Sequence, residues 1–282
     1  MAEAGSLAAG YANRRRTMKP LHLIGVFIKS SFQRETAFRF NFGINFLHTF
    51  LNIAGSLGGL YVVFQNGNSL NGWQYREAMA LLGVYLLVLG LKELVIGPGL
   101  ESLSGLSGEL WTGSFDFTLL KPLPEQFHIS FRKWNLWSIV DVIAAAVLII
   151  VSLFSGPGIN GLHDGSPVLF VLALMISLVL IYSVLLILAS AAFWYLGTPL
   201  MWIFDSLIQT GRFPVGIYPG FFRFLLTWVI PVGFVITVPA QALAGTLEPV
   251  VLAGGAALAA VLFFIATTFF RISVKKYASA SS

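Results

Sequence analysis

The chain has 282 residues, of which 57% are apolar and only 10% are charged, whereas soluble domains carry about 25% charged residues. A globule so poor in charge could not cover its own surface, so the composition predicts an integral membrane protein. The absence of cysteine excludes disulfides, thiol catalysis, iron–sulfur clusters and most zinc sites. The net charge of +5 favours anionic lipids over nucleic acid as partner, because the basic residues flank apolar runs and form no separate stripe.

Residues 1–18 are predicted to form a flexible tail, and no apolar core of signal-peptide length follows their arginines. Residues 19–41 are predicted to form an interfacial amphipathic helix. His22, Lys29 and Gln33 share one helical face, whereas Ile24, Phe32 and other apolar residues share the other. Such a helix lies on the inner leaflet with its basic residues near the lipid phosphates. The alternative is a plain linker before the first membrane span.

Six segments have roughly the 20 apolar residues that are needed to cross about 30 Å of hydrocarbon. The sequence therefore predicts an all-α membrane protein with six spans. They cover residues 42–64, 78–96, 136–154, 168–196, 221–238 and 250–270 of a transmembrane domain at 42–271, with a cytoplasmic tail at 272–282.

The lysines and arginines predict that both termini are cytoplasmic, because cytoplasmic loops carry an excess of these residues. One side of the six-span topology holds Arg14, Arg15, Arg16, Lys19, Lys29, Arg34, Arg39, Lys121, Arg132, Lys133, Arg212, Arg223, Arg271, Lys275 and Lys276. The other side holds only Arg76, and Lys92 lies within the second span.

Proline and glycine mark the expected ends of spans. Residues 97–99 (Gly-Pro-Gly) are predicted to end the second span, and residues 156–158 (Gly-Pro-Gly) to end the third. Pro231 and Pro239 predict that the chain breaks and turns back near the outer face, as a re-entrant segment between spans five and six. The small residues at 55–59 and 253–260 favour close helix packing, either within the chain or at a dimer seam.

Three kinds of site are disfavoured by the motifs. The chain contains no Gly-Lys pair and therefore no P-loop, so any ATP must be held by another chain. Gly105–Gly108 (GLSG) resembles the serine motif of rhomboid proteases, but spans four to six contain no histidine to act as the base. The four histidines form no metal-binding pair, so neither a catalytic nor a metal site is expected.

Lys92, Glu93 and Asp141 are the candidates for functional ionisable residues inside the predicted spans. Such residues cost about 2.5–3.5 kcal/mol each at a helix centre on insertion scales, so they usually face protein or water. Adjacent side chains point about 100° apart on a helix, so we expect Lys92 to pair with Asp141 or a lipid headgroup rather than with Glu93. A structural pair at the cytoplasmic mouth is favoured over a proton relay.

The loop between spans two and three contains the stretch GSFDFTLLKPLP, residues 113–124. Gly113 interrupts the preceding leucine pattern, and Ser114 is expected to cap a short helix that has Asp116 in its first turn. Pro122 ends that helix. The sequence thus predicts a short, rigid cytoplasmic helix on stalks that continue from two spans, which is a lever suited to a soluble partner.

This pattern resembles the ABC type-2 exporter permeases, in a bacterial subgroup of single-domain, six-span subunits. Their coupling helix has the form Gly-Thr/Ser-x-Glu/Asp, then leucines, then proline. The matching residues here are Gly113, Ser114, Asp116, Leu119, Leu120 and Pro122, with Lys121 between the last two, and further along Arg212, Phe213, Pro214, Tyr218, Pro219, Ile230, Pro231, Pro239 and Ala240. Phe115 and Phe117 make this coupling helix unusually aromatic and leave open which face meets the partner.

The resemblance implies a permease in the bacterial inner membrane that works with a second permease subunit and with cytoplasmic ATPase subunits, which hold ATP and Mg. It also implies that Pro231, Pro239 and Ala240 lie at an outer gate. The substrate expected from the aromatic content is hydrophobic or lipid-like. Two alternatives remain: an integral membrane enzyme acting on lipids, which needs clustered polar residues at one leaflet, and an ion-coupled secondary carrier, which needs several carboxylates within the membrane.

Overall fold

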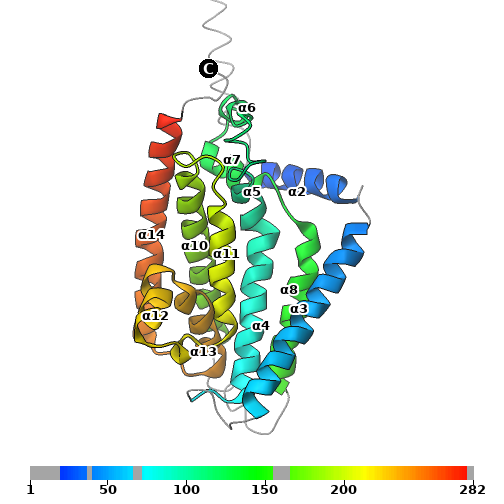
Figure 1. Ribbon diagram of the computed structural model, residues 1–282, viewed down its shortest axis with the longest axis vertical. Helices are drawn as coiled ribbons and strands as arrows, with labels where there is room; N and C mark the ends of the chain where they lie inside the picture. Colours follow the sequence, from blue (N-terminus) through cyan, green and yellow to red (C-terminus); the bar gives the residue numbers. More distant parts are fainter. Residues whose placement is uncertain (1–19, 37–39, 66–71, 155–165, 278–282) are drawn as a thin grey trace, which may run out of the picture.

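The computed structural model describes residues 20–36, 40–65, 72–154 and 166–277, and the regular elements in these ranges are all helices. Long helices pack side by side into an elongated bundle (Figure 1). One end, the α6 end, carries α6 (Asp116–Leu119) and α7 (Glu125–Phe131). The opposite end, the α13 end, carries α12 (Gly220–Phe224) and α13 (Val238–Ala244).

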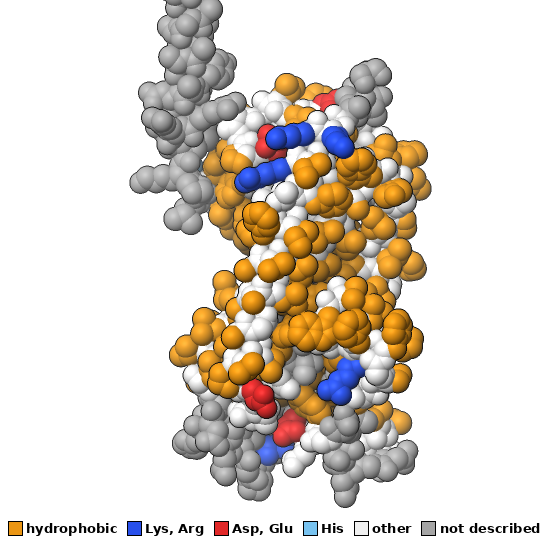
Figure 2. Space-filling model, turned by 90° about the vertical axis from the view of Figure 1, so that its left-hand side faces the viewer, with side chains coloured by type: hydrophobic (Ala, Val, Ile, Leu, Met, Phe, Trp, Pro, Cys, Tyr) orange, Lys and Arg blue, Asp and Glu red, His pale blue; other side chains and the backbone are white. Residues whose placement is uncertain are grey.

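Five helices are long and apolar enough to cross a membrane, or up to six if one bent pair counts as a span. They are Gly43–Gln65, Tyr75–Glu101, Leu136–Phe154, Pro167–Ala191 and Pro249–Lys276. On the face in Figure 2, hydrophobic side chains cover the middle of the molecule, and charged side chains lie toward its two ends. This apolar band agrees with the prediction of an all-helical membrane protein.

The first helix, α2 (Pro20–Thr36), lies across the α6 end of the bundle (Figure 1). It ends at Thr36, so the predicted helix at 19–41 is shorter than expected, and Phe40 already belongs to α3 (Phe40–Gln65). His22, Lys29 and Gln33 are exposed, as their shared face predicts. The predicted tail at 1–18 lies outside the described residues, and the predicted tail at 272–282 begins within α14 (Pro249–Lys276).

The second span was predicted to end at residues 97–99, but the helix continues through them. It runs from α4 (Tyr75–Leu91) through a π-helical turn, η1 (Lys92–Ile96), into α5 (Gly97–Glu101). Pro98 has no N–H to donate to the carbonyl of Leu94, which would interrupt an ordinary helix. Here the backbone N–H of Asn135 donates to that carbonyl at 3.2 Å. A distant segment therefore satisfies the group that Pro98 leaves free, and the helix continues.

Gly99, the glycine after Pro98, allows close packing of α5 on α7. A Cβ atom at Gly99 would lie 2.1 Å from the backbone oxygen of Ile129. We expect Gly99→Ala to destabilise the protein by about 1–3 kcal/mol, because a backbone carbonyl cannot move aside as a side chain can. Thermal unfolding of the detergent-purified variant measures the loss. Gly58→Ala is the matched control, because a Cβ there meets nothing within 4 Å, and an equal loss in both variants would contradict this reading.

The core of the bundle contains two close helix pairs. α4 packs on α8 (Ile139–Phe154), where Gly83 and Gly90 admit Ile149 and Val142. α10 (Pro167–Ala191) packs on α14, where Ala259 is buried and Gly255 meets Phe234. Within residues 253–260, Gly255 and Ala259 therefore pack inside the chain, whereas most of their neighbours are exposed. In contrast, Gly55 and Gly59 of α3 meet nothing within 4 Å, so their face is not packed within the chain.

The predicted fifth span is broken in the structure, and another segment precedes it in the bundle. α10 ends at Ala191, and the chain then descends from the α6 end through α11 (Leu200–Ile208) and the 3₁₀ turn η3 (Gln209–Arg212) (Figure 1). The predicted span at 221–238 is not one helix: the segments Gly220–Val229 and Gly233–Ala244 are bent by 76° at the break between them. Both lie toward the α13 end (Figure 1).

This path also corrects the predicted positions of two arginines. Arg223 lines a cavity with Trp73, which precedes α4 at the α13 end, so Arg223 lies at the end opposite to the one predicted. Arg212 lies inside the bundle, where its Nε donates to the hydroxyl of Tyr85 at 3.2 Å. The described basic residues at the α6 end are Lys29, Arg34, Lys121, Arg132, Lys133, Arg271, Lys275 and Lys276. Arg76 and Arg223 lie at the other end, so the charge asymmetry remains.

Candidate functional site

The segment that joins the second and third spans folds at the α6 end. Gly113 has φ +72°, a left-handed conformation that glycine adopts without strain. Helix α6 begins at Asp116 and ends at Leu119, before Pro122. The expected cap by Ser114 is wrong: no side chain caps α6, and the Ser114 hydroxyl instead lies 2.9 Å from that of Thr112. The helix is therefore held by its packing rather than by a cap.

The two faces of α6 differ in what they contact. Phe115, just before the helix, is completely buried, and its ring centroid lies 5.2 Å from those of Phe193 and Tyr277. Thr118 is also buried. Phe117 and Leu120 point outward, with 68% and 81% of their surface exposed. The aromatic character that left the helix orientation open is thus divided between an anchor, Phe115, and an exposed apolar face.

An ion pair holds the α6 segment onto α5 and α7. Arg132 binds Glu109 at 2.6 Å and also donates to the hydroxyls of Thr118 and Ser102, at 3.1 and 3.0 Å. Glu109 also receives Lys133 at 3.3 Å. Because Arg132 and Glu109 are both largely buried, the segment is a rigid extension of the second span rather than a loose loop. In the sequence, the spacing of Arg132 and Glu109 gives no sign of this pair.

His128 lies beneath α6. Its Nε2 lies 3.0 Å from the ammonium of Lys121, and its ring packs on Phe27 of α2 with centroids 5.5 Å apart. Burial, together with the nearby charges of Lys121 and Arg132, lowers the pKa of His128 to about 4. His128 is therefore neutral at neutral pH, and Nε2 accepts a hydrogen bond from Lys121.

We expect acid to weaken the α6 end. The pKa of His128 is about 4 in the folded protein, against an ordinary value of 6.5, so the unfolded state binds the proton first. The stabilising contribution of neutral His128 is fully present above pH 6.5 and is lost as the pH falls toward 4, by up to about 2.5 kcal/mol at pH 4.5. Thermal unfolding at pH 7 and pH 4.5 measures this loss, and His128→Gln should remove that part of it. Equal acid sensitivity of both proteins would contradict the assignment to His128.

Helix α2 is bonded to the same region. The backbone N–H of Trp134 donates to the hydroxyl of the buried Ser31 at 3.1 Å, and that of Leu136 donates to the carboxylate of Glu35 at 3.0 Å. Partial burial raises the pKa of Glu35, although the N–H of Leu136 opposes the shift. The first helix is thus joined to the segment between α7 and α8 by hydrogen bonds from backbone N–H groups to its side chains, which the sequence could not reveal.

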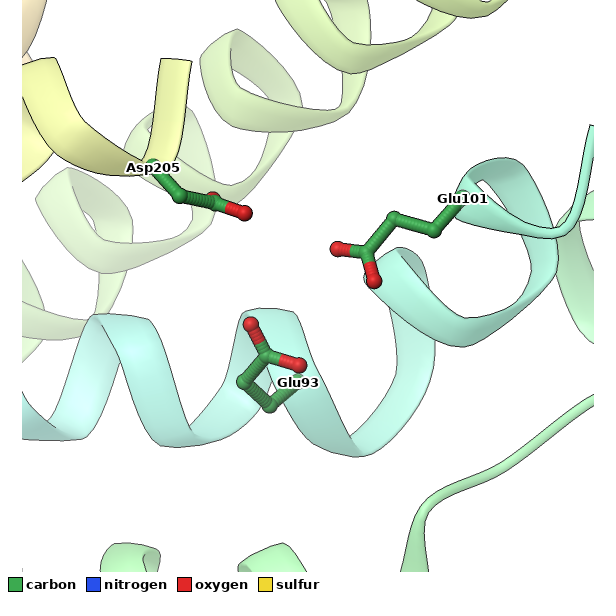
Figure 3. A group of neighbouring side chains, drawn as sticks. All are labelled: Glu93, Glu101 and Asp205. Carbon is green, nitrogen blue, oxygen red and sulfur yellow. The ribbon is translucent and has the colours of Figure 1, made fainter. Parts of the chain in front are cut away.

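A second polar site lies around Lys92, whose side chain is 1% exposed. Its ammonium lies 2.7 Å from Glu93, 3.1 Å from Glu101 and 2.6 Å from Asp205. The three carboxylates come from η1, α5 and α11 and converge on one point (Figure 3). Their oxygens lie within 4.8 Å of one another, a spacing that could hold a metal ion, but the ammonium of Lys92 already lies among them.

The expected partners of Lys92 were wrong. The stem of Lys92 is long enough to bring its ammonium back to Glu93, although adjacent side chains diverge on a helix. Asp141 instead accepts a hydrogen bond from the hydroxyl of Thr49 on α3. Asp205, which lies outside all six predicted spans, is on α11. One feature of the sequence could have identified Asp205 as a site residue: it is the one acidic residue between 167 and 247.

A cavity of about 610 Å³ extends from this cluster into the bundle. Elements α3, α4, η1, α8, α11 and η3 form its walls. Its polar lining includes Lys92, Glu93, Asp141, Asp205, Arg212, Tyr85, His48, Asn52 and Gln209, and its apolar lining includes Leu51, Leu86, Leu89 and Ile208. The guanidinium of Arg212 lies 5.7 Å from the centre of the Tyr85 ring. We call this space the Lys92 cavity.

The predicted gate residues lie at the α13 end. Pro231 lies in the break of the bent pair, Pro239 is in the first turn of α13, and both are buried, as is Ala240. A second cavity, of about 590 Å³, lies between the two halves of the bent pair. It is lined by Arg223, Thr237, Gln241 and several aromatic residues, among them Trp73 and Trp228.

The comparisons with known proteins agree with this architecture. The model of a family described as "ABC-2 family transporter protein" matches residues 50–281, which include α4 through α14 and both polar sites. No curated protein and no solved structure matches the chain. The family match covers most of the chain, including the α6 segment and the bent pair. The chain therefore belongs to the ABC-2 family of transporter proteins.

Proposed function

We propose that this chain is the transmembrane permease subunit of an ATP-driven ABC exporter in a bacterial inner membrane. It moves a hydrophobic or lipid-like substrate outward by alternating access, and a separate cytoplasmic ATPase binds ATP and Mg. The observation that carries the proposal is the exposed apolar face of α6, formed by Phe117 and Leu120. It projects from a helix that is rigidly anchored to the end of the second span.

The basic residues support a cytoplasmic location for the α6 end, because lysines and arginines gather there in preference to the α13 end. α14 ends at the same end as α6, which supports a cytoplasmic C-terminus. Since α2 lies at that end as well, the N-terminus is proposed to be cytoplasmic too. Lipid hydrocarbon does not reach α6 in this orientation, so Phe117 and Leu120 need a protein partner to cover them.

Coupling to the ATPase is assigned to Gly113, Ser114, Asp116, Leu119, Leu120, Lys121 and Pro122. Phe115 and the Arg132–Glu109 ion pair hold this segment to the bundle. A push on α6 is therefore carried into α5 and α4 rather than absorbed by a loop. Helix α2 is proposed to lie on anionic lipids of the inner leaflet, with Lys29 directed to their phosphates.

The bent pair is proposed to form a re-entrant outer gate, and the α11 segment to be the fifth of six spans. Its two halves stay at the α13 end (Figure 1), and the break falls at Ile230–Pro231. Buried Pro231, Pro239 and Ala240 would fix the gate geometry. Backbone of this irregular kind is tolerated in a membrane only where it is buried in protein or lines a water-filled cavity.

A second permease subunit, identical or related, is proposed to cover α3. Only 11% of the residues in the apolar stretch of α3 are buried within the chain, against 67% in that of the second span. Gly55 and Gly59 present open space on this helix. Small residues allow helix backbones to approach closely in membranes, so this face is suited to a partner helix.

The experiment that tests the proposal is purification of the tagged chain from its own bacterium, followed by identification of the proteins bound to it. We expect an ATPase with a P-loop, and we expect the reconstituted complex to transport only with hydrolysable ATP. An ion-coupled carrier is the second candidate, because the structure brings Glu93, Glu101 and Asp205 together near one another. Transport that persists without ATP and collapses with an ion gradient would favour that carrier.

A further inference from the structure

We infer that the Lys92 cavity binds the positively charged head of an amphiphilic organic cation, with Asp141 and Asp205 as its counter-charges. This inference rests on the proposed transport function and names the substrate class for it. It comes from the size of the cavity, the sign of its charge and the chemistry of its walls.

The charges around the cavity do not balance. Lys92 and Arg212 are the cations of the lining, and Glu93, Asp141 and Asp205 are its carboxylates. Glu101 also pairs with Lys92 at 3.1 Å. Three carboxylates of the lining and Glu101 thus share two cations. Uncompensated charge is costly at membrane depth, so the cavity favours an additional positive charge.

The existing cations cannot supply that compensation. The ammonium of Lys92 has three N–H donors, and three carboxylates already surround it at 2.6–3.1 Å. Arg212 is instead engaged with Tyr85, whose hydroxyl accepts its Nε–H and whose ring faces its guanidinium. Asp141 has the hydroxyl of Thr49 as its hydrogen-bond partner, which carries no charge. Asp141 is therefore the carboxylate best placed to meet a ligand.

The walls fit an organic cation better than a bare metal ion. The volume of about 610 Å³ lies within the range of small-molecule pockets, about 300–1,000 Å³. Leu51, Leu86, Leu89 and Ile208 offer apolar surface beside the carboxylates. The carboxylate group with metal-like spacing already surrounds Lys92. The rest of the Lys92 cavity is thus lined partly by apolar side chains and partly by carboxylates. Such a lining suits an amphiphile with a cationic head.

The test measures saturable binding of radiolabelled tetraphenylphosphonium to the purified chain in uncharged lipid nanodiscs, without nucleotide. We expect Asp141→Asn to weaken binding at least about tenfold, because the amide keeps the bond to Thr49 but loses the charge. Asp205→Asn should weaken it as well. Glu248→Gln is the matched control, because Glu248 is an exposed carboxylate before α14, at the α13 end.

Competition in the wild-type protein keeps the inference testable if a variant fails to fold. We expect an unlabelled quaternary ammonium amphiphile to displace the probe, and the anionic amphiphile taurocholate not to do so. Displacement by millimolar Mg²⁺ would assign the site to an inorganic cation and overturn the inference. Absent saturable binding, or unchanged binding in Asp141→Asn, would also overturn it. Because no ATPase takes part, these outcomes are separate from those that test ATP-driven transport.

Discussion

Replacing Lys92 with leucine should destabilise the protein by about 3–5 kcal/mol, the cost typical of breaking a buried ion pair from one side. The side chain of Lys92 is 1% exposed, whereas Glu93, Glu101 and Asp205 are each about one-third exposed or slightly more. Removal of the ammonium leaves three carboxylates converging with no cation between them (Figure 3). The Lys92→Leu variant should therefore unfold on the order of 10 °C below the wild type in a thermal scan.

Two further variants separate this electrostatic effect from a general effect of losing a lysine. Lys133→Leu is the matched control, because Lys133 also pairs with a carboxylate, but Glu109 keeps Arg132 when Lys133 is removed. We expect it to cost less than about 1 kcal/mol. Adding Asp205→Asn to Lys92→Leu should restore part of the lost stability, since it removes one unpaired charge. A double variant no more stable than Lys92→Leu would contradict the account.

The long helices could be predicted from the sequence because their signal is local. Apolar runs of sufficient length define α3, α4, α8, α10 and α14, and each agrees with a predicted span within a few residues. Where boundaries were wrong, the missing information came from elsewhere in the chain. Residues 97–99 read as a stop, yet the N–H of Asn135 satisfies Leu94 and the helix continues. No local pattern contains that bond.

The predicted fifth span shows the opposite difficulty, because a run of sufficient apolar length does not form one straight helix. Residues 221–238 have the length of a span, but the segments on either side of the break at Pro231 are bent by 76°. α11 has only nine residues and includes Asp205, so it resembled a loop. The ammonium of Lys92 makes that carboxylate tolerable inside the bundle. A carboxylate that is neutralised by a lysine of another helix cannot be placed inside the bundle from hydropathy alone.

The candidate sites were predictable to different degrees. The α6 segment was identified by its residues, and Lys92 and Glu93 by their location in an apolar helix. Their geometry was not predictable, because it depends on partners far away in sequence, such as Asp205 for Lys92 and Phe193 for Phe115. The pairing of Arg132 with Glu109 had no distinguishing signal among ordinary loop charges.

Aspartate at both Phe117 and Leu120 should abolish coupling to the ATPase while leaving the bundle intact. Both side chains are mostly exposed, and neither belongs to the buried core. The free energy of unfolding of the double variant should therefore be within about 0.5 kcal/mol of that of the wild type. A partner that buries these side chains would lose apolar contact and have to bury two charges. We expect more than a tenfold loss of bound ATPase and of ATP-driven transport. Co-purification and transport by reconstituted vesicles measure the two effects.

Phe115→Ala provides the contrast that gives this experiment its meaning. Phe115 is buried against Phe193 and Tyr277, so its truncation should cost about 3–5 kcal/mol of stability and act through the anchor of α6 rather than its outer face. Asp116→Arg should weaken the complex as the outward variants do, because it reverses a charge in the same helix. If the Phe117/Leu120 double variant bound the ATPase and transported normally, α6 could not be the surface through which ATP hydrolysis moves the bundle.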